Sequence, residues 1–290
     1  MAYDSSSNKM NINWYPGHMT KAKRDLSKHL NMIDIVLEVI DARAPLSSVN
    51  PDFSPMFQGK KLIMVLNKAD MADPAVTARF IEYFKNKGIT AVSYSAKQPD
   101  RKKLMDCIGK VAEGIRERYV SRGMSYTVRA LVCGIPNVGK SAIINTLYGS
   151  KKVTVANRPG VTRDLRWIRI GDYLELMDSP GLLWPKITNR QTGINIALLG
   201  SINEQILPED DLALYIIDLL KKDHPGLLME RYRLSSLKET NVEILEDICS
   251  SRGMIIRGGE FDYERAESML LEEFRNGKIG RFSLEEPHDD

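Results

Sequence analysis

The stretch RALVCGIPNVGKSAIINTLYG, residues 129 to 149, decides the fold that this sequence predicts. It joins an apolar run of strand length to a segment of helical period through GIPNVGKS, residues 134 to 141, which has the spacing of a phosphate-binding loop. Gly134 and Gly139 permit the tight turn in which backbone N–H groups surround phosphates at the start of a helix. The stretch therefore predicts a nucleotide-binding α/β domain.

Several residues of this loop have separate expected roles. Lys140 would reach the β- and γ-phosphates, and Ser141 would ligate Mg²⁺. The side-chain oxygen of Asn137 would hold a monovalent cation, potassium for example, beside these phosphates, or Asn137 simply caps the loop. The remaining expected nucleotide contacts in this loop come from Val138, Gly139 and Ala142.

Apolar runs of strand length alternate with segments of helical period from residue 33 onward. The other runs are IDIVLEVIDA, KLIMVLNKAD, ITAVSYSAK and YLELMDSPG. This alternation predicts an α/β fold, a doubly wound parallel sheet covered by helices, with ligands bound at the carboxyl ends of the strands. After residue 185 the pattern becomes helical. We therefore predict a nucleotide-binding domain over 1–184, with a flexible lead-in over 1–12, and a smaller all-α domain over 185–290.

NKAD, residues 67 to 70, ends one of the strand-like runs and indicates which base is bound. Asp70 can accept hydrogen bonds from N1–H and the 2-amino group of guanine, Asn67 can bond its Hoogsteen edge, and Lys68 can pack across the ring. Adenine lacks both of those donors, so GTP is favoured over ATP. A weaker pattern follows the next run, where the expected base contacts come from Ser95, Ala96 and Lys97.

Two later motifs fit a γ-phosphate. In PGVT, residues 159 to 162, Thr162 would be a second Mg²⁺ ligand and would sense the γ-phosphate. In DSPG, residues 178 to 181, Asp178 would hold the same ion through water, and the N–H of Gly181 would contact the γ-phosphate. Either motif alone could be a simple turn. Together they predict that Lys140, Thr162 and Gly181 act on the terminal phosphate.

Composition and charge limit the classes of protein. No run of about 18 uncharged apolar residues suggests a membrane span, and the first residues lack the features of a signal or transit peptide. The three widely spaced cysteines argue against a disulfide framework or a zinc site, so we expect a cytoplasmic protein. Residues 1–184 hold 28 of the 41 lysine and arginine residues and 17 of the 38 acidic ones. The formal net charge is therefore +11 for this part and −8 for the remainder. The basic part favours a polyanionic partner, or is ordinary surface charge.

The motifs stand in an unusual order, because the base-reading motifs precede the phosphate loop. WYPGHM, DARAP, NKAD, SAK, GIPNVGKS, PGVT and DSPGLLWPK in this order resemble the circularly permuted GTPases of ribosome assembly, specifically the ribosome biogenesis GTPase A group. The resemblance implies a P-loop GTPase that binds GTP and GDP, requires Mg²⁺ and is stimulated by the large ribosomal subunit during its late maturation. It also implies contacts of the C-terminal helical domain with ribosomal RNA. We expect a monomer with no membrane attachment.

One departure from many nucleotide hydrolases is Leu182, which stands where a glutamine often positions the attacking water. Either another residue organises the water, or Leu182 is core and hydrolysis is very slow. His18 is the best replacement in the sequence, because a histidine near neutral pKa can orient water and lies here beside a Pro-Gly turn; the family resemblance points to the same residue. Asp41 and Arg43 either anchor the segment around His18 or form a structural ion pair.

RNA contacts have two candidate locations. The predicted helix TKAKRDLSKHL would grip phosphates through a basic face, or that face is merely solvated; its cations are Lys21, Lys23, Arg24 and Lys28. In the acidic C-terminal part the local cations are Arg275, Lys278 and Arg281. The alternative to an assembly GTPase is a GTP-gated RNA-binding switch with little hydrolysis of its own. A GTPase directed to tRNA or membranes is disfavoured, since neither a modification domain nor an amphipathic anchor is evident.

Overall fold

The computed structural model describes residues 9–13, 17–149, 166–202 and 207–288. They divide into two compact units. The first unit comprises Met1–Gly193 together with Ser283–Asp290, and the second comprises Ile194–Phe282. The boundary thus lies near Gly193 rather than at residue 184, and the last residues return to the first unit. The two ends of the helical unit are both joined to the nucleotide-binding unit.

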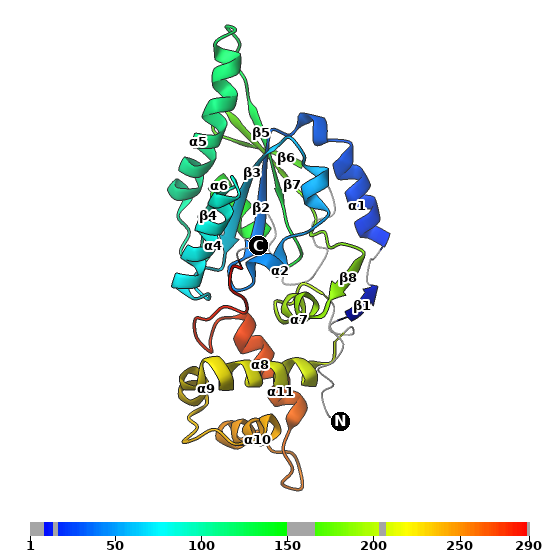
Figure 1. Ribbon diagram of the computed structural model, residues 1–290, viewed down its shortest axis with the longest axis vertical. Coiled ribbons are helices and arrows are strands. Elements are labelled where there is room, and N and C mark those ends of the chain that lie inside the picture. Colours follow the sequence, from blue (N-terminus) through cyan, green and yellow to red (C-terminus); the bar gives the residue numbers. More distant parts are fainter. Residues whose placement is uncertain (1–8, 14–16, 150–165, 203–206, 289–290) are drawn as a thin grey trace. The chain divides into compact units, whose positions relative to one another are not determined.

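The first unit is built on a six-stranded sheet, whose strands lie side by side in Figure 1. Its spatial order is β4 (Thr90–Ser93), β3 (Lys61–Asn67), β2 (Ile35–Asp41), β5 (Val128–Cys133), β7 (Leu174–Asp178) and β6 (Arg166–Ile170). The five strands expected from apolar runs are confirmed and pair in parallel. The sheet is not wholly parallel, however, because β6 pairs antiparallel with β7 at the edge. Its sequence RWIRI mixes polar and apolar residues, and an antiparallel edge strand on an otherwise parallel sheet is common.

Helices connect these strands. In this unit they are α1 (Gly17–Ser27), the 3₁₀ turn η1 (Leu30–Met32), α2 (Pro45–Ser48), α3 (Phe53–Met56), α4 (Pro74–Asn86), α5 (Arg101–Val120) and α6 (Lys140–Tyr148). Helix α4 begins where the side chain of Asp73 caps two backbone N–H groups and Pro74 occupies the first turn. Its apolar face, including Phe80 and Phe84, packs against Ile40 and Leu66 of the central strands. This packing fixes the ends of β2 and β3, where polar motifs follow.

A second, two-stranded sheet pairs β1 (Lys9–Asn13) with β8 (Lys186–Asn189) in antiparallel fashion. Neither strand was expected, since residues 1–12 were predicted to be flexible and the segment after 185 to be helical. Each segment is short and mostly polar, so its strand signal is weak by itself, and backbone pairing across 173 residues of sequence supplies the missing stabilisation. The pairing joins the segment before residue 14 to the segment that follows DSPGLLWP.

The helical unit contains α8 (Glu209–Asp223), α9 (Pro225–Tyr232), α10 (Asn241–Arg252) and α11 (Tyr263–Arg275), and α7 (Arg190–Leu198) spans the boundary between the units. Figure 1 shows α8 to α11 grouped together. Buried side chains such as Leu212, Ile216, Ile248 and Leu270 form their shared core. The predicted change from a sheet to helices is therefore confirmed.

Among the described residues, no helix combines the length and apolar character needed to cross a membrane.

Candidate functional site

The phosphate loop connects β5 to α6 and adopts a conformation that its glycines require. Gly134 has φ of 144°, and a Cβ there would lie 2.3 Å from the carbonyl oxygen of Val39. Gly139 has φ of 95°, and a Cβ there would lie 2.2 Å from Nδ2 of Asn67. Asn137 is also left-handed, with φ of 62°, a conformation that asparagine tolerates better than most residues. The loop thus leaves backbone N–H groups at the N-terminus of α6 in the geometry suited to an anion.

Lys140, the first residue of α6, reaches back across this loop. Its ammonium donates a hydrogen bond of 2.8 Å to the carbonyl oxygen of Ile135, and the residue is only 8% exposed. Burial lowers the pKa of Lys140 to about 8, although the charge of Asp178 opposes the shift. A cation held at the centre of the loop can bind the oxygens of a terminal phosphate.

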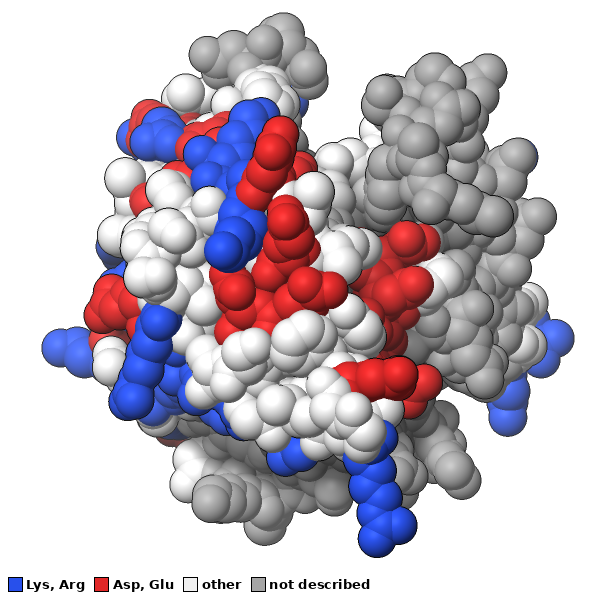
Figure 2. Space-filling model, turned by 90° about the horizontal axis from the view of Figure 1, so that it is seen from below, with Lys and Arg blue, Asp and Glu red and all other residues white. Residues whose placement is uncertain are grey.

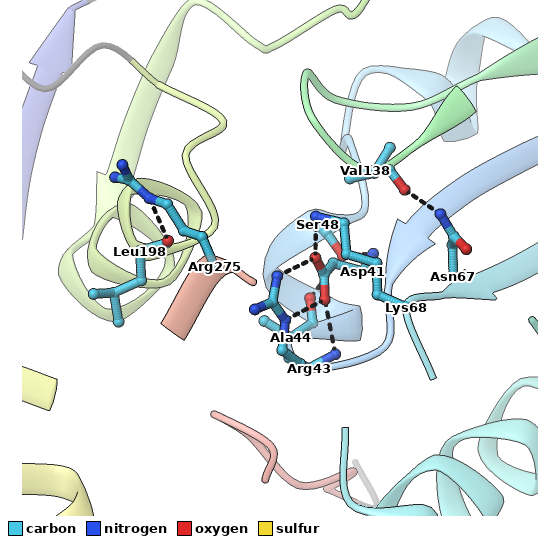
Figure 3. A network of polar contacts seen from close by, with 9 residues as sticks. All are labelled: Asp41, Arg43, Ala44, Ser48, Asn67, Lys68, Val138, Leu198 and Arg275. Carbon is cyan, nitrogen blue, oxygen red and sulfur yellow. Dashed lines mark hydrogen bonds and ion pairs between the residues drawn. The ribbon is translucent and has the colours of Figure 1, made fainter. Parts of the chain in front are cut away.

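NKAD and the phosphate loop meet directly, as Figure 3 shows. The Nδ2 of Asn67 donates a hydrogen bond of 2.7 Å to the carbonyl oxygen of Val138. Since a side-chain amide has two N–H donors, the second can bond the Hoogsteen edge of guanine, where N7 and O6 are acceptors. Asn67 therefore connects the expected base site to the expected phosphate site.

The structure also brings SAK to NKAD, because β4 pairs with β3. Ser95 donates its hydroxyl to Oδ1 of Asp70 at 2.7 Å, and the ammonium of Lys97 lies 3.5 Å from Oδ2. Ala96, between them, is half-buried. A carboxylate oxygen can accept more than one hydrogen bond, so Asp70 retains capacity for the two donors of guanine.

Lys68 takes part in a buried network that the sequence analysis did not predict (Figure 3). Its ammonium lies 2.9 Å from Oδ2 of Asp41, which also accepts a bond of 2.8 Å from Nη2 of Arg43. Burial would raise the pKa of Asp41, but the charges of Arg43 and Lys68 outweigh it and hold that pKa below its usual range. DARAP thus forms an ion pair within the protein, and it extends to the base-reading lysine. The available signal was the position of Asp41 directly after an apolar strand.

DSPG lies against the phosphate loop, since β7 is the neighbour of β5. The backbone N–H and the hydroxyl of Ser179 both donate to the carbonyl oxygen of Val132, at 3.1 and 2.9 Å. A Cβ at Gly181 would lie 2.8 Å from Cα of Pro136, so a glycine is needed for this approach. The segment that is expected to respond to the γ-phosphate is therefore packed on the loop that is expected to bind it.

Leu182, the next residue, is core. It is 2% exposed, and its backbone N–H donates to the carbonyl oxygen of Gly134 at 3.2 Å. Its apolar side chain is packed in the core and cannot hold an attacking water. This burial agrees with both alternatives for the position, namely that another residue organises the water or that hydrolysis is very slow.

Some of the expected site residues lie outside the described part of the chain. These are Thr162 with the rest of PGVT, and Trp14 to Pro16 ahead of α1. His18 is the second residue of α1, and only its backbone is described. Among the described residues, Ser141 in the first turn of α6 and the buried Asp178 at the end of β7 are oxygen donors of the kind that Mg²⁺ prefers. Ser141 follows Lys140 in α6, and Asp178 lies opposite Val132, two residues before the phosphate loop begins, so both donors lie beside that loop and their chemistry fits the ion.

The basic face of α1 is smaller than the sequence suggested. Lys23 is half-buried and pairs with Asp52 at 2.6 Å. Lys28 pairs with Asp25 at 2.7 Å, but it stays exposed, as do Lys21 and Arg24.

Comparison with known proteins gives consistent matches. Residues 129–251 match the family model described as 50S ribosome-binding GTPase. Ribosome biogenesis GTPase A of Bacillus cereus is 40% identical over 97% of this chain and 95% of its own length. The protein of that name in Thermotoga maritima is 31% identical over 96% of this chain and 95% of its own length. The solved structure of GDP-bound YlqF covers 92% of this chain and 100% of its own, with 27% identity and a TM-score of 0.67. The form of YlqF from T. maritima described as GNP-bound gives a TM-score of 0.66 at 27% identity, over 93% of this chain and 100% of its own.

Proposed function

We propose that this chain, which belongs to the ribosome biogenesis GTPase A family, binds the large ribosomal subunit, promotes its late assembly and leaves after hydrolysing GTP. The chain is a ribosome-assembly GTPase, so GTP hydrolysis is its activity. The proposal adds the large subunit as the partner that stimulates this hydrolysis. We also expect the protein to act as a monomer in the cytoplasm.

The observation that carries the proposal is the hydrogen bond of 2.7 Å from Asn67 to Val138. It places the guanine-reading NKAD segment beside the phosphate loop, although the two are far apart in sequence and occur in permuted order. With Asp70 held by Ser95, the arrangement suits a guanine nucleotide whose phosphates lie against Lys140. A nucleotide bound there would contact Gly181, whose segment runs on to α7 and the helical unit. Loss of the terminal phosphate can therefore be transmitted along the chain.

The burial of Leu182 supports stimulation by a partner. Because that side chain cannot position water, the free protein should hydrolyse GTP slowly until another group is brought to the γ-phosphate. We propose His18 as that group. It lies in the first turn of α1, directly after Gly17, the first residue of that helix. H18A should lower the stimulated rate by about 100-fold, with nucleotide affinity changed by less than about threefold. An equal loss of both would remove His18 from this role.

Two cations complete the proposed site. Mg²⁺ would be held by Ser141, Thr162 and, through water, Asp178, where it would neutralise charge on the β- and γ-phosphates. Potassium would be held by the side-chain oxygen of Asn137, whose left-handed backbone conformation forms part of the turn of this loop. Replacing potassium with sodium should then reduce hydrolysis in the wild type but have no effect in N137A. Equal rates in both salts would exclude potassium.

The proposed RNA surface lies mainly on the nucleotide-binding unit, where Lys21, Arg24 and Lys28 of α1 are exposed. In the helical unit, Arg275 donates instead to the carbonyl oxygens of Ala197 and Leu198, which leaves Lys278 and Arg281 as its exposed tail cations. Figure 2 shows acidic side chains gathered near the middle of one face, with most of the basic ones toward its edge. One acidic group contains Glu209, Asp210, Glu264 and Glu267. Burial raises the pKa of Glu267, and the negative charges of the other three residues raise it further. Such a group repels phosphates.

Single-turnover hydrolysis with and without ribosomal subunits tests the proposal. Large subunits, in mature or immature form, should accelerate the reaction, whereas small subunits should not. If no large subunit has an effect, the protein is instead a GTP-gated RNA-binding switch with little hydrolysis, which the buried Leu182 also allows. A salt titration with the K21E/R24E/K28E variant would test the α1 surface, since loss of phosphate contacts must reduce the salt dependence of binding.

A further inference from the structure

Asn50 holds together three parts of the nucleotide-binding unit. It lies in the short connection between α2 and α3, and it is 1% exposed. Its Nδ2 donates a hydrogen bond of 2.8 Å to the carbonyl oxygen of Leu182. Its Oδ1 accepts from the backbone N–H of Asp52 at 3.0 Å, and its own N–H donates to Oε1 of Glu38 at 3.1 Å. The side-chain amide is therefore fixed in orientation by a partner at each end.

The contact with Leu182 completes a clamp on the segment that follows DSPG. The N–H of Leu182 donates to Gly134, at the start of the phosphate loop, while its carbonyl oxygen accepts from Asn50. Gly181, one residue earlier, already touches Pro136 so closely that no Cβ would fit. The N–H of Leu182 belongs to the same planar peptide unit as the carbonyl group of Gly181, so its bond to Gly134 fixes one side of Gly181, while the close approach to Pro136 restricts the Cα. The bond from Asn50 holds the next peptide unit and so limits the movement of this backbone, including the N–H of Gly181.

We propose that Asn50 is a positioning residue for GTP hydrolysis, which keeps Gly181 and its N–H in place beside the phosphate loop by holding the carbonyl oxygen of the next residue, Leu182. The inference rests on the proposed contact between Gly181 and that phosphate. It assigns Asn50 no contact with the nucleotide. In this family member the backbone after the DSPG glycine is thus held by a side chain from a different part of the chain, while the buried leucine anchors it in the core.

The position of Asn50 predicts an effect that depends on the number of phosphates. Base contacts at Asp70 and phosphate contacts at Lys140 do not involve Leu182, so binding of GDP should be nearly independent of Asn50. Only a triphosphate reaches Gly181. A disordered or rotated Gly181 should therefore weaken binding of a triphosphate and slow its hydrolysis, whereas damage to the fold would weaken binding of both nucleotides.

The test compares N50A with the wild type by titration calorimetry, using GDP and the non-hydrolysable β,γ-imido analogue of GTP with Mg²⁺, and by single-turnover hydrolysis. In N50A the affinity for the analogue relative to GDP should fall by about tenfold, as expected for loss of one buried hydrogen bond, with GDP affinity within about twofold of the wild type. The hydrolysis rate should fall by about tenfold or more.

D52A is the matched control. It removes the ion pair with Lys23 but keeps the backbone N–H of residue 52, which donates to Oδ1 of Asn50. The affinity of D52A for the analogue relative to GDP should therefore equal that of the wild type.

N50D provides a second readout and decides the question if N50A does not fold. An ionised carboxylate would repel the carbonyl oxygen of Leu182, whereas a protonated carboxyl group can donate to it. The rate of N50D relative to the wild type should therefore rise as pH is lowered from 8 to 6. In N50D the affinity for the analogue relative to GDP should rise in the same way, whereas a purely structural role would change the affinity for both nucleotides together.

Two outcomes would overturn the inference, and a third separates it from the proposed function. An unchanged affinity ratio in N50A, or an equal loss of affinity for GDP and for the analogue, removes Asn50 from the positioning role. G181A tests the underlying contact, because the added Cβ would force this segment away from Pro136. If G181A lowers the affinity ratio and N50A does not, only the inference about Asn50 fails. If neither does, the proposed contact of Gly181 with the γ-phosphate is wrong as well.

Discussion

Asn67 and Val138, 71 positions apart in the sequence, are joined by a hydrogen bond of 2.7 Å between the side-chain amide of one and the backbone carbonyl of the other. The bond ties the segment that is expected to read the base to the loop that is expected to bind the phosphates. It also explains why the permuted order of motifs is tolerated. The expected ligand contacts lie at the ends of β3, β4, β5 and β7, and these ends are set by the sheet rather than by the order of the strands along the chain.

Base discrimination should depend on both donors of guanine. Inosine diphosphate lacks the 2-amino group, so it should bind about 10- to 100-fold more weakly than GDP because one hydrogen bond to Asp70 is lost. In D70A the two nucleotides should bind with similar, low affinity. Competition titrations measure this, and equal affinity of the wild type for both would show that Asp70 does not read the base edge.

Nucleotide affinity should fall at alkaline pH. Burial lowers the pKa of Lys140 to about 8, so below this pH the lysine is already charged, and above it the free protein must take up a proton to bind phosphate. GDP affinity should therefore decrease by up to about tenfold per pH unit above about pH 8. K140M should bind weakly at all pH values and lack this decrease. A wild-type affinity that is constant from pH 7.5 to 9.5 would contradict the assignment.

Stability should decrease as pH rises because of Glu38, which faces Cys133 across the β2–β5 pairing. Burial raises the pKa of Glu38 from 4.5 to about 8, despite the hydrogen bond from Asn50. The folded state therefore retains a proton that the unfolded chain has lost. Between these two pH values its contribution to the free energy of unfolding should fall by about 1.4 kcal/mol per pH unit.

E38Q is the matched variant, because its amide oxygen can still accept from Asn50 and it cannot ionise. Urea denaturation at pH 5 and at pH 8 should show a larger loss of stability for the wild type than for E38Q. The same loss in both proteins would mean that Glu38 does not control this dependence.

The C-terminal residues should stabilise the nucleotide-binding unit. The carboxylate of Glu285 accepts from the backbone N–H of Ser47 at 3.0 Å and from its hydroxyl at 2.8 Å, and the N–H of Leu284 donates to Arg43 at 2.7 Å. E285A should lower the free energy of unfolding by about 1–2 kcal/mol, since it removes both of these hydrogen bonds to the buried Ser47.

E286A is the control for this change. Glu286 pairs with Arg79, but both side chains are 52% exposed, so its loss should cost less than about 0.5 kcal/mol. Chemical denaturation of the two variants gives the comparison. Equal stability of E285A and E286A would show that the C-terminal contacts do not hold the unit together.

The sequence by itself determined five of the six strands of the main sheet, the phosphate loop and the segment that is expected to read guanine. Apolar runs identify five central strands because those strands are buried, and glycines at 134, 139 and 181 mark backbone approaches that no other residue permits. Such signals are local, so they can be read without knowing the fold.

Only the tertiary structure decided what depends on distant partners. The strands β1, β6 and β8 carry weak local patterns and form because a partner strand accepts their hydrogen bonds. The links from Asp41 to Lys68 and from Asn50 to Leu182, and the return of Glu285 to Ser47, join residues whose types alone suggest no partner. A polar side chain specifies that it needs a hydrogen bond when it is buried, and only the packed chain determines which group provides it.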